Sequence, residues 1–167
     1  ELEKPSLSQE GYKANFTNEG GVGRIRYLKY IMGLWLVQCL QKEYPSASFV
    51  TMAEEARQAQ GFDYQLAIDD PAYLMPEKVT AVIVEECYKK GYPVPTTLGE
   101  FAYAIYCSLA NDYARALLSI KTITGIDNPD LYVVGGGSKN LFLNELIAQK
   151  THKNVILGSS EATSLGN

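Results

Sequence analysis

The sequence contains few of the residues that build metal sites or nucleophilic sites. Among its 167 residues there are three cysteines and one histidine. Cys39, Cys87 and Cys107 are widely spaced within helical patterns, so we predict reduced thiols in the core rather than disulfides or metal ligands. His152 lies beside a lysine near an expected helix end, which favours a solvated position. With no Ser-His-Asp pattern and no metal-ligand spacing, the sequence predicts no catalytic residue and no metal ligand in this chain.

Positive charge and long apolar runs are also scarce. Fifteen Lys and Arg stand against 19 Asp and Glu, giving a net charge of −4. This balance argues against duplex nucleic acid as a partner, because a phosphate backbone requires a basic surface. No apolar run approaches the roughly 18 residues of a membrane span, so no membrane partner is expected. The chain begins with neither an initiator Met nor an apolar leader, and we expect a piece of a longer protein.

What is present is ordinary for a globular protein. Apolar residues make up 46% of the chain and charged residues 20%, which is enough for a core without disulfides or metals. A length of 167 residues is typical of one domain. We therefore expect a single domain over residues 1–167.

The most informative segment predicts a strand, a glycine turn and a helix. Residues 131–134 are apolar and predict a strand buried on both faces, and Gly135, Gly136 and Gly137 follow them directly. Free backbone N–H groups at such a turn and at the start of the next helix favour a phosphate or a polar purine edge. A tight strand-to-helix connection without a ligand explains the three glycines equally well at this point.

Strand and helix patterns alternate along the rest of the chain, which favours an α/β or α+β layer fold. The longest helix, expected over residues 97–123, would measure roughly 40 Å and lie across a sheet. Residues 63–75 are expected to form a loop whose two aspartates are surface turn residues. The other expected elements are strands over 15–19, 24–28 and 154–158, and helices from residue 31, from a cap at Ser48 or Thr51, and over 76–90.

A polar residue interrupts the apolar stripe of the first of these helices. Gln38 shares the helical spacing of Ile31, Leu34, Trp35 and Cys39. A buried amide without partners costs about 1–3 kcal/mol. A hydrogen bond at a helix end or between helices is the favoured interpretation from the residues alone, and a ligand contact is the alternative.

Four segments of the chain resemble the second domain of the FGGY carbohydrate kinases. They are residues 15–21, 26–38, 133–140 and 161–167, which follow the family's order and extend over nearly the whole chain. The resemblance implies an α/β fold of the actin-like ATPase (RNase H-like) type, incomplete at its N-terminal side. It also implies a cytoplasmic sugar kinase that uses ATP and Mg²⁺, with a sugar and an adenine nucleotide as partners. The segment 26–38 favours the branch that phosphorylates L-rhamnulose.

The resemblance implies roles for individual residues on the nucleotide side. Gly135, Gly136 and Gly137 match the family's adenosine motif, in which backbone lies against the nucleotide. Gln38 matches a glutamine that contacts ATP, which raises the weight of the ligand alternative. Asn140 is expected to reach adenine or ribose, and a purely helix-capping role is the alternative.

On the sugar side, Tyr30 takes the place of a family asparagine that contacts the sugar. Tyrosine keeps a hydroxyl but lacks the two-sided hydrogen bonding of an amide. A kinase of the same family acting on another ketose or a polyol is therefore an alternative, and a non-enzymatic interaction module with the same half-fold is another. The family's catalytic aspartate and phosphate loop precede the matched segments, so this chain is expected to be inactive alone. Self-association through surface exposed by truncation is also expected.

Overall fold

The computed structural model of the chain describes residues 1–158. The last segment that carries the family resemblance, residues 161–167, lies outside the described residues. The elements are, in chain order, α1 (Gln9–Lys13), β1 (Phe16–Gly20), β2 (Ile25–Lys29), α2 (Trp35–Glu43), α3 (Phe49–Gln58), η1 (Pro71–Tyr73), α4 (Val79–Lys90), α5 (Leu98–Thr124), β3 (Asp130–Val133), η2 (Gly135–Lys139), α6 (Leu141–Thr151) and β4 (Asn154–Leu157).

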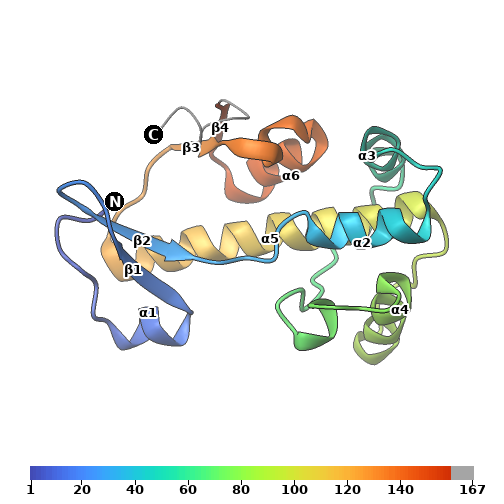
Figure 1. Cartoon of the computed structure of the whole chain (residues 1–167), viewed down its shortest axis with the longest axis horizontal. Helices are drawn as coiled ribbons and strands as arrows, with labels where there is room; N and C mark the ends of the chain where they lie inside the picture. Colours follow the sequence, from blue (N-terminus) through green and yellow to red (C-terminus); the bar gives the residue numbers. More distant parts are fainter. Residues whose placement is uncertain (159–167) are drawn as a thin grey trace.

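The long helix α5 runs through the middle of the molecule, between the other helices (Figure 1). It begins with a capping box, in which Thr97 and Glu100 each accept a backbone N–H of the other, and it ends at Gly125 in a left-handed conformation with φ 72°. Every residue from 101 to 110 is buried. The prediction that this helix lies across a sheet is wrong. It packs against α3 and α6, and the sheets within residues 1–158 have only two strands each.

The two small sheets differ in direction and exposure. Strands β1 and β2 form the expected antiparallel hairpin, with Phe16 opposite Lys29. Strands β3 and β4 pair in parallel. The expectation that β3 is buried on both faces is wrong, because Tyr132 is 67% exposed and Val134, just after the strand, is 54% exposed. A parallel pair covered by one helix, α6, leaves its other face open in the described part of the chain.

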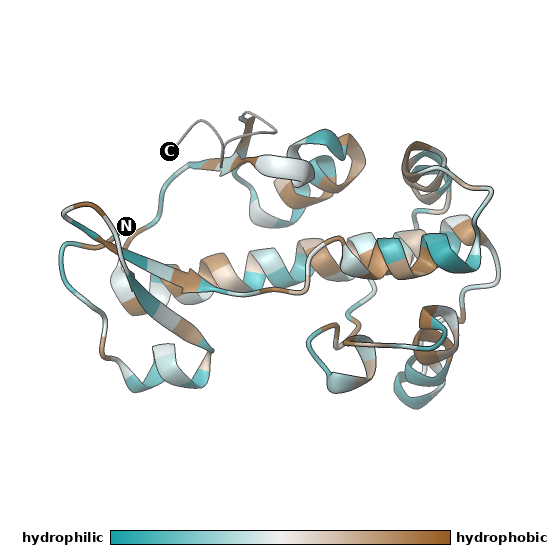
Figure 2. Cartoon of the chain, in the orientation of Figure 1, coloured by the Kyte–Doolittle hydropathy of each residue, from teal (hydrophilic) through white to brown (hydrophobic). Residues whose placement is uncertain are grey.

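Local capping explains where the shorter helices begin and end. Ser48 caps α3 by accepting the N–H of Thr51 at 3.0 Å, so Thr51 lies inside the helix. Helix α2 begins at Trp35 rather than near Ile31, and the residues between β2 and α2 are irregular. Helix α4 begins at Val79, three residues after the expected start, and ends at the left-handed Gly91 as predicted. Brown and teal segments alternate along α2 and α4 in Figure 2, as expected of amphipathic helices.

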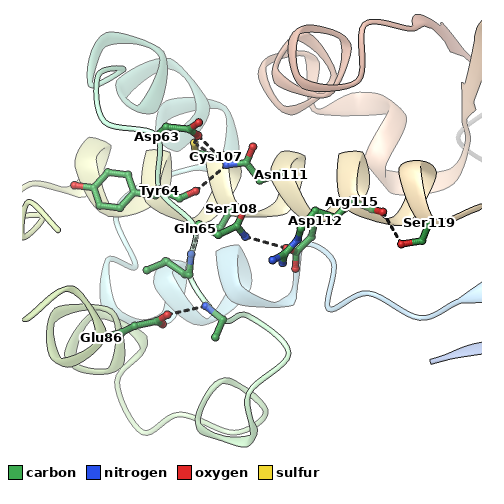
Figure 3. A network of polar contacts seen from close by, with 12 residues as sticks. Asp63, Tyr64, Gln65, Glu86, Cys107, Ser108, Asn111, Asp112, Arg115 and Ser119 are labelled. Atoms are coloured by element: carbon green, nitrogen blue, oxygen red, sulfur yellow. Dashed lines mark hydrogen bonds and ion pairs between the residues drawn. The ribbon is translucent and has the colours of Figure 1, made fainter. Parts of the chain in front are cut away.

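The segment between α3 and η1 is packed against α5 although it has no regular structure. Tyr64, Leu66 and Ile68 alternate with exposed or half-buried neighbours and are themselves buried. The N–H of Leu66 donates to Ser108 Oγ at 3.0 Å, and Asn111 Nδ2 donates to the carbonyl of Tyr64 at 2.9 Å (Figure 3). Polar side chains of α5 therefore satisfy the loop backbone, which is what allows a loop to lie in the core.

Several single-residue predictions agree with the structure. All three cysteines are free and buried. His152 is exposed and ends α6 with a left-handed φ of 54°. The aspartates Asp69 and Asp70 are exposed, and Asp70 caps η1.

No helix of the described chain combines the length and the apolar character needed to cross a bilayer.

Candidate functional site

A pocket of about 600 Å³ lies where α2, α3, α5 and the glycine turn meet. Segments separated by more than a hundred residues in the sequence contribute to it. Three of the predicted nucleotide-side residues, Gln38, Gly136 and Asn140, line its wall. The other lining residues are Leu34, Val37, Phe49, Val50, Ala53, Glu54, Arg57, Tyr106, Lys139, Leu141 and Phe142.

The three glycines of the turn have different roles. Gly135 adopts a left-handed φ of 72°, a conformation that strains any residue with a side chain. Its carbonyl accepts the Ser138 hydroxyl at 2.7 Å, which closes the turn. Gly136 lines the pocket, and no atom lies within 4 Å of the place that its Cβ would occupy. A Cβ on Gly137 would make an ordinary 3.7 Å contact with Val133. Gly136 is therefore the glycine at which bare backbone faces open space in the pocket.

The Gln38 side chain is exposed, contrary to the interpretation of a buried amide. The reason is that α2 begins only at Trp35, so Ile31 does not belong to the helical stripe that would have enclosed the glutamine. Trp35 does not line the pocket, and its indole N–H donates to the carbonyl of Leu74 at 3.1 Å. The Gln38 amide is therefore not buried, and its side chain lines the pocket.

Asn140 and Asn144 join the glycine turn to α6. Asn140 Oδ1 accepts the N–H of Leu143 at 3.0 Å, so the helix-capping role exists, and the residue lines the pocket as well. Asn144 is buried, and its Nδ2 donates to the carbonyl of Gly137 at 3.1 Å. The turn is consequently held in shape by the helix that follows it.

Tyr106 is a lining residue that no sequence pattern singled out. It lies on α5, is fully buried, and its hydroxyl has no hydrogen-bond partner among residues 1–158. Phe142 meets its ring at 88° with the centroids 5.8 Å apart, which fixes the ring. Burial raises the pKa of Tyr106.

Arg57, on α3, also lines the pocket and was not selected from the sequence. Its guanidinium pairs with the Glu145 carboxylate of α6 through two hydrogen bonds, of which Nη2 to Oε1 measures 2.9 Å. The guanidinium carbon lies 5.0 Å from the centre of the Phe142 ring. The hydrogen bonds between the two groups raise the pKa of Arg57 and lower that of Glu145. Because this pair joins two helices distant in sequence, no local pattern reveals it.

Tyr30 does not belong to this pocket. It follows β2, is 77% exposed, and donates its hydroxyl to Glu19 Oε1 at 2.8 Å within the hairpin region. That hydrogen bond raises the pKa of Tyr30. The structure therefore does not bring Tyr30 together with the glycine turn, and its contact with a sugar stays a prediction.

The chemistry of the pocket suits a mostly apolar ligand. Its charged lining residues are Glu54, Arg57 and Lys139, and Arg57 already has a carboxylate partner. Apolar side chains supply most of the wall, with a few polar groups among them, as is typical of small-molecule sites. In the described part of the chain, no group of three or more His, Cys, Asp or Glu is placed to hold a metal ion.

Comparison with known proteins gives one family and one group of relatives. The chain is 40% identical over 168 residues to the rhamnulokinase of Oceanobacillus iheyensis, a match that covers 98% of this chain and 35% of that protein. It is 36% identical over 169 residues to the rhamnulokinase of Bacillus subtilis, covering 100% of this chain and 35% of the relative. The rhamnulokinase of Bacteroides thetaiotaomicron is 35% identical over 168 residues, with 100% and 35% covered.

The chain therefore spans about a third of the length of these relatives. The family model described as "FGGY family of carbohydrate kinases, C-terminal domain" matches residues 1–167, which is the entire chain. The chain belongs to the FGGY family of carbohydrate kinases and corresponds to the C-terminal domain of these proteins.

Proposed function

We propose that this chain is the nucleotide-binding domain of an ATP-dependent sugar kinase and that its pocket holds the adenosine end of ATP. The observation that carries the proposal is that Gln38, Gly136 and Asn140, which match the family's nucleotide residues, line one pocket. Apolar walls fit a purine ring, and backbone at Gly136 can approach it closely because no side chain intervenes. Gly135 and Gly137 support the site by shaping the turn.

Only the adenine ring and the ribose of the nucleotide are assigned to this pocket. A triphosphate with Mg²⁺ requires several cations and carboxylates around it. The pocket has one carboxylate and two cations, and no acidic metal cluster occurs within residues 1–158. We assign the phosphates, Mg²⁺ and the proton-accepting base to regions that the full-length relatives have and this chain does not span. This chain alone is then expected to transfer no phosphate.

We propose L-rhamnulose as the sugar and the cytoplasm, where ATP is abundant, as the location. The support is the identity of 35–40% to several rhamnulokinases. The bond of Tyr30 to Glu19 is the observation that favours a second candidate, a kinase of another ketose or of a polyol. A phosphorylation assay of a full-length parent protein with L-rhamnulose, another ketose and a polyol distinguishes them. Preference for L-rhamnulose supports the first candidate, and preference for the other ketose or the polyol supports the second.

Titration of ADP into the 167-residue chain by calorimetry tests the nucleotide site. Gly136→Val places a side chain in the pocket and is expected to weaken ADP binding by about tenfold or more, roughly 1.4 kcal/mol in binding free energy. Gly61→Val is the matched control, because Gly61 also has no atom within 4 Å of its Cβ position and lies outside the pocket. Its ADP affinity is expected to equal that of the wild type. Equal affinities for all three proteins, or no binding by the wild type, would contradict the proposal.

A further inference from the structure

One wall of the pocket is a flat cationic surface that the adenosine motif does not account for. Phe142, on α6, is only 2% exposed, while the Arg57 side chain in front of it keeps 45% of its surface exposed. The guanidinium lies over the Phe142 ring, with its carbon 5.0 Å from the ring centre, and lines the pocket. The accessible flat surface on this side is therefore the guanidinium and not the aromatic ring behind it.

The neighbours of Arg57 fix the plane of this surface. Glu145 accepts two hydrogen bonds from the same guanidinium, an arrangement that holds the group in one orientation. Phe142 supports its inner side. Such a planar, delocalised cation stacks well on an aromatic ring, whereas the ammonium of a lysine does not. No reorientation of the side chain is needed before a ring can lie against it.

We propose that Arg57 is a specificity-determining residue whose guanidinium stacks on the purine ring of the nucleotide, a role that rests on the proposed adenosine site. Glu145 and Phe142 act as positioning residues for it. A purine offers a larger aromatic face than a pyrimidine, so the stacked surface favours ADP over UDP. The ribose and the phosphates, which the two nucleotides share, do not depend on this contact.

The test compares ADP and UDP affinities in wild type and Arg57→Lys, measured by calorimetry on the whole chain. The lysine keeps the positive charge and a partner for Glu145 but removes the planar group. We expect ADP affinity to fall roughly fivefold, as for loss of a partly exposed cation–π contact, and UDP affinity to fall much less. Arg115→Lys is the matched control, because Arg115 also pairs with a carboxylate, Asp112, but lines a different pocket. Its ratio of ADP to UDP affinity is expected to equal that of the wild type.

The ratio separates stacking from a merely structural ion pair. A structural role would lower the melting temperature of Arg57→Lys or weaken both nucleotides by the same factor, and either result without a change in the ratio overturns the inference. If ADP binds the wild type and Gly136→Val prevents it while the ratio is unchanged, only the role of Arg57 fails. If the wild type binds no ADP, or Gly136→Val binds it as well as the wild type does, the adenosine site fails first and the role of Arg57 with it.

Discussion

The two halves of α5 contribute to two pockets that are similar in size but differ in the number of charged lining residues. Residues 101–110 of the helix are all buried, and Tyr106 from this half lines the candidate nucleotide pocket. The second half is more exposed and lines a pocket of about 560 Å³ with Arg115, Leu118 and Lys121. Lys150 and Lys153 also contribute to that second pocket, so it is the more highly charged of the two.

Charge alone does not make the second pocket the better ligand site. Lys121 and Lys153 both bind the Asp127 carboxylate, at 2.8 and 2.6 Å, and Lys150 binds Asp63 at 2.6 Å. These cations already have partners within the chain, whereas the first pocket has an exposed glutamine, an open glycine and a tyrosine hydroxyl that has no hydrogen-bond partner among residues 1–158. Of the two pockets, the first therefore offers more groups that a ligand could contact without displacing an ion pair.

The largest expected difference between the two halves is in packing. Ile105→Ala removes a fully buried side chain and is expected to lower the free energy of unfolding by about 3 kcal/mol. Leu118, in the second half, is 64% exposed, so Leu118→Ala is expected to change it by less than about 0.5 kcal/mol. Urea denaturation of both variants measures the difference. Similar losses would show that the two halves do not differ as the structure indicates.

A smaller effect is expected from the Tyr106 hydroxyl. Tyr106→Phe removes a buried polar group without a partner, so the free energy of unfolding is expected to rise by about 1 kcal/mol in the absence of nucleotide. Tyr73→Phe is the control, because the buried hydroxyl of Tyr73 donates to Glu86 and its loss is expected to cost about 2 kcal/mol. A stability loss for Tyr106→Phe as large as that of Tyr73→Phe would mean that its hydroxyl is bonded in the free protein.

The smallest expected effect concerns the ion pairs of the second pocket and appears as a pH dependence. Hydrogen bonds from Lys121 and Lys153 lower the pKa of Asp127 to about 2. Since the ordinary value is higher, near 3.8, the contribution of this carboxylate to stability is complete above about pH 5 and is lost as the pH falls through 2.

Asp127→Asn removes this contribution, so wild type and variant should converge in stability as the pH falls from 4 to 2. Thermal melts at several pH values measure the difference. A constant difference between wild type and variant across that range would show that the carboxylate is not paired as described.

Local signals predicted most of the secondary structure. The glycines at positions 91 and 125 and the hairpin glycines act through neighbours within a few residues, so their helix ends and turn could be located from the sequence. The family match confirms the α/β, actin-like second-domain class. The exposure of Tyr132 could not be foreseen, because a buried-strand pattern does not tell how many strands the chain itself supplies.

The candidate site was predictable only where it rests on a motif. Gly136 and Asn140 follow one another closely in the glycine turn, and Gln38 came from the family resemblance. Arg57 and Tyr106 reach the pocket because α3, α5 and α6 pack together, a contact between helices that no local spacing encodes. Only the tertiary structure gives these two residues a place in the site.

Adenosine is proposed to bind in the first pocket and not in the second. Amide chemical shifts of the isotopically labelled chain, followed during titration with ADP, test its location directly. We expect the largest changes at residues 135–140 and at Gln38, and little change at residues 114–121 and 150–153. Changes concentrated in those latter segments, or none at the glycine turn, would contradict the account.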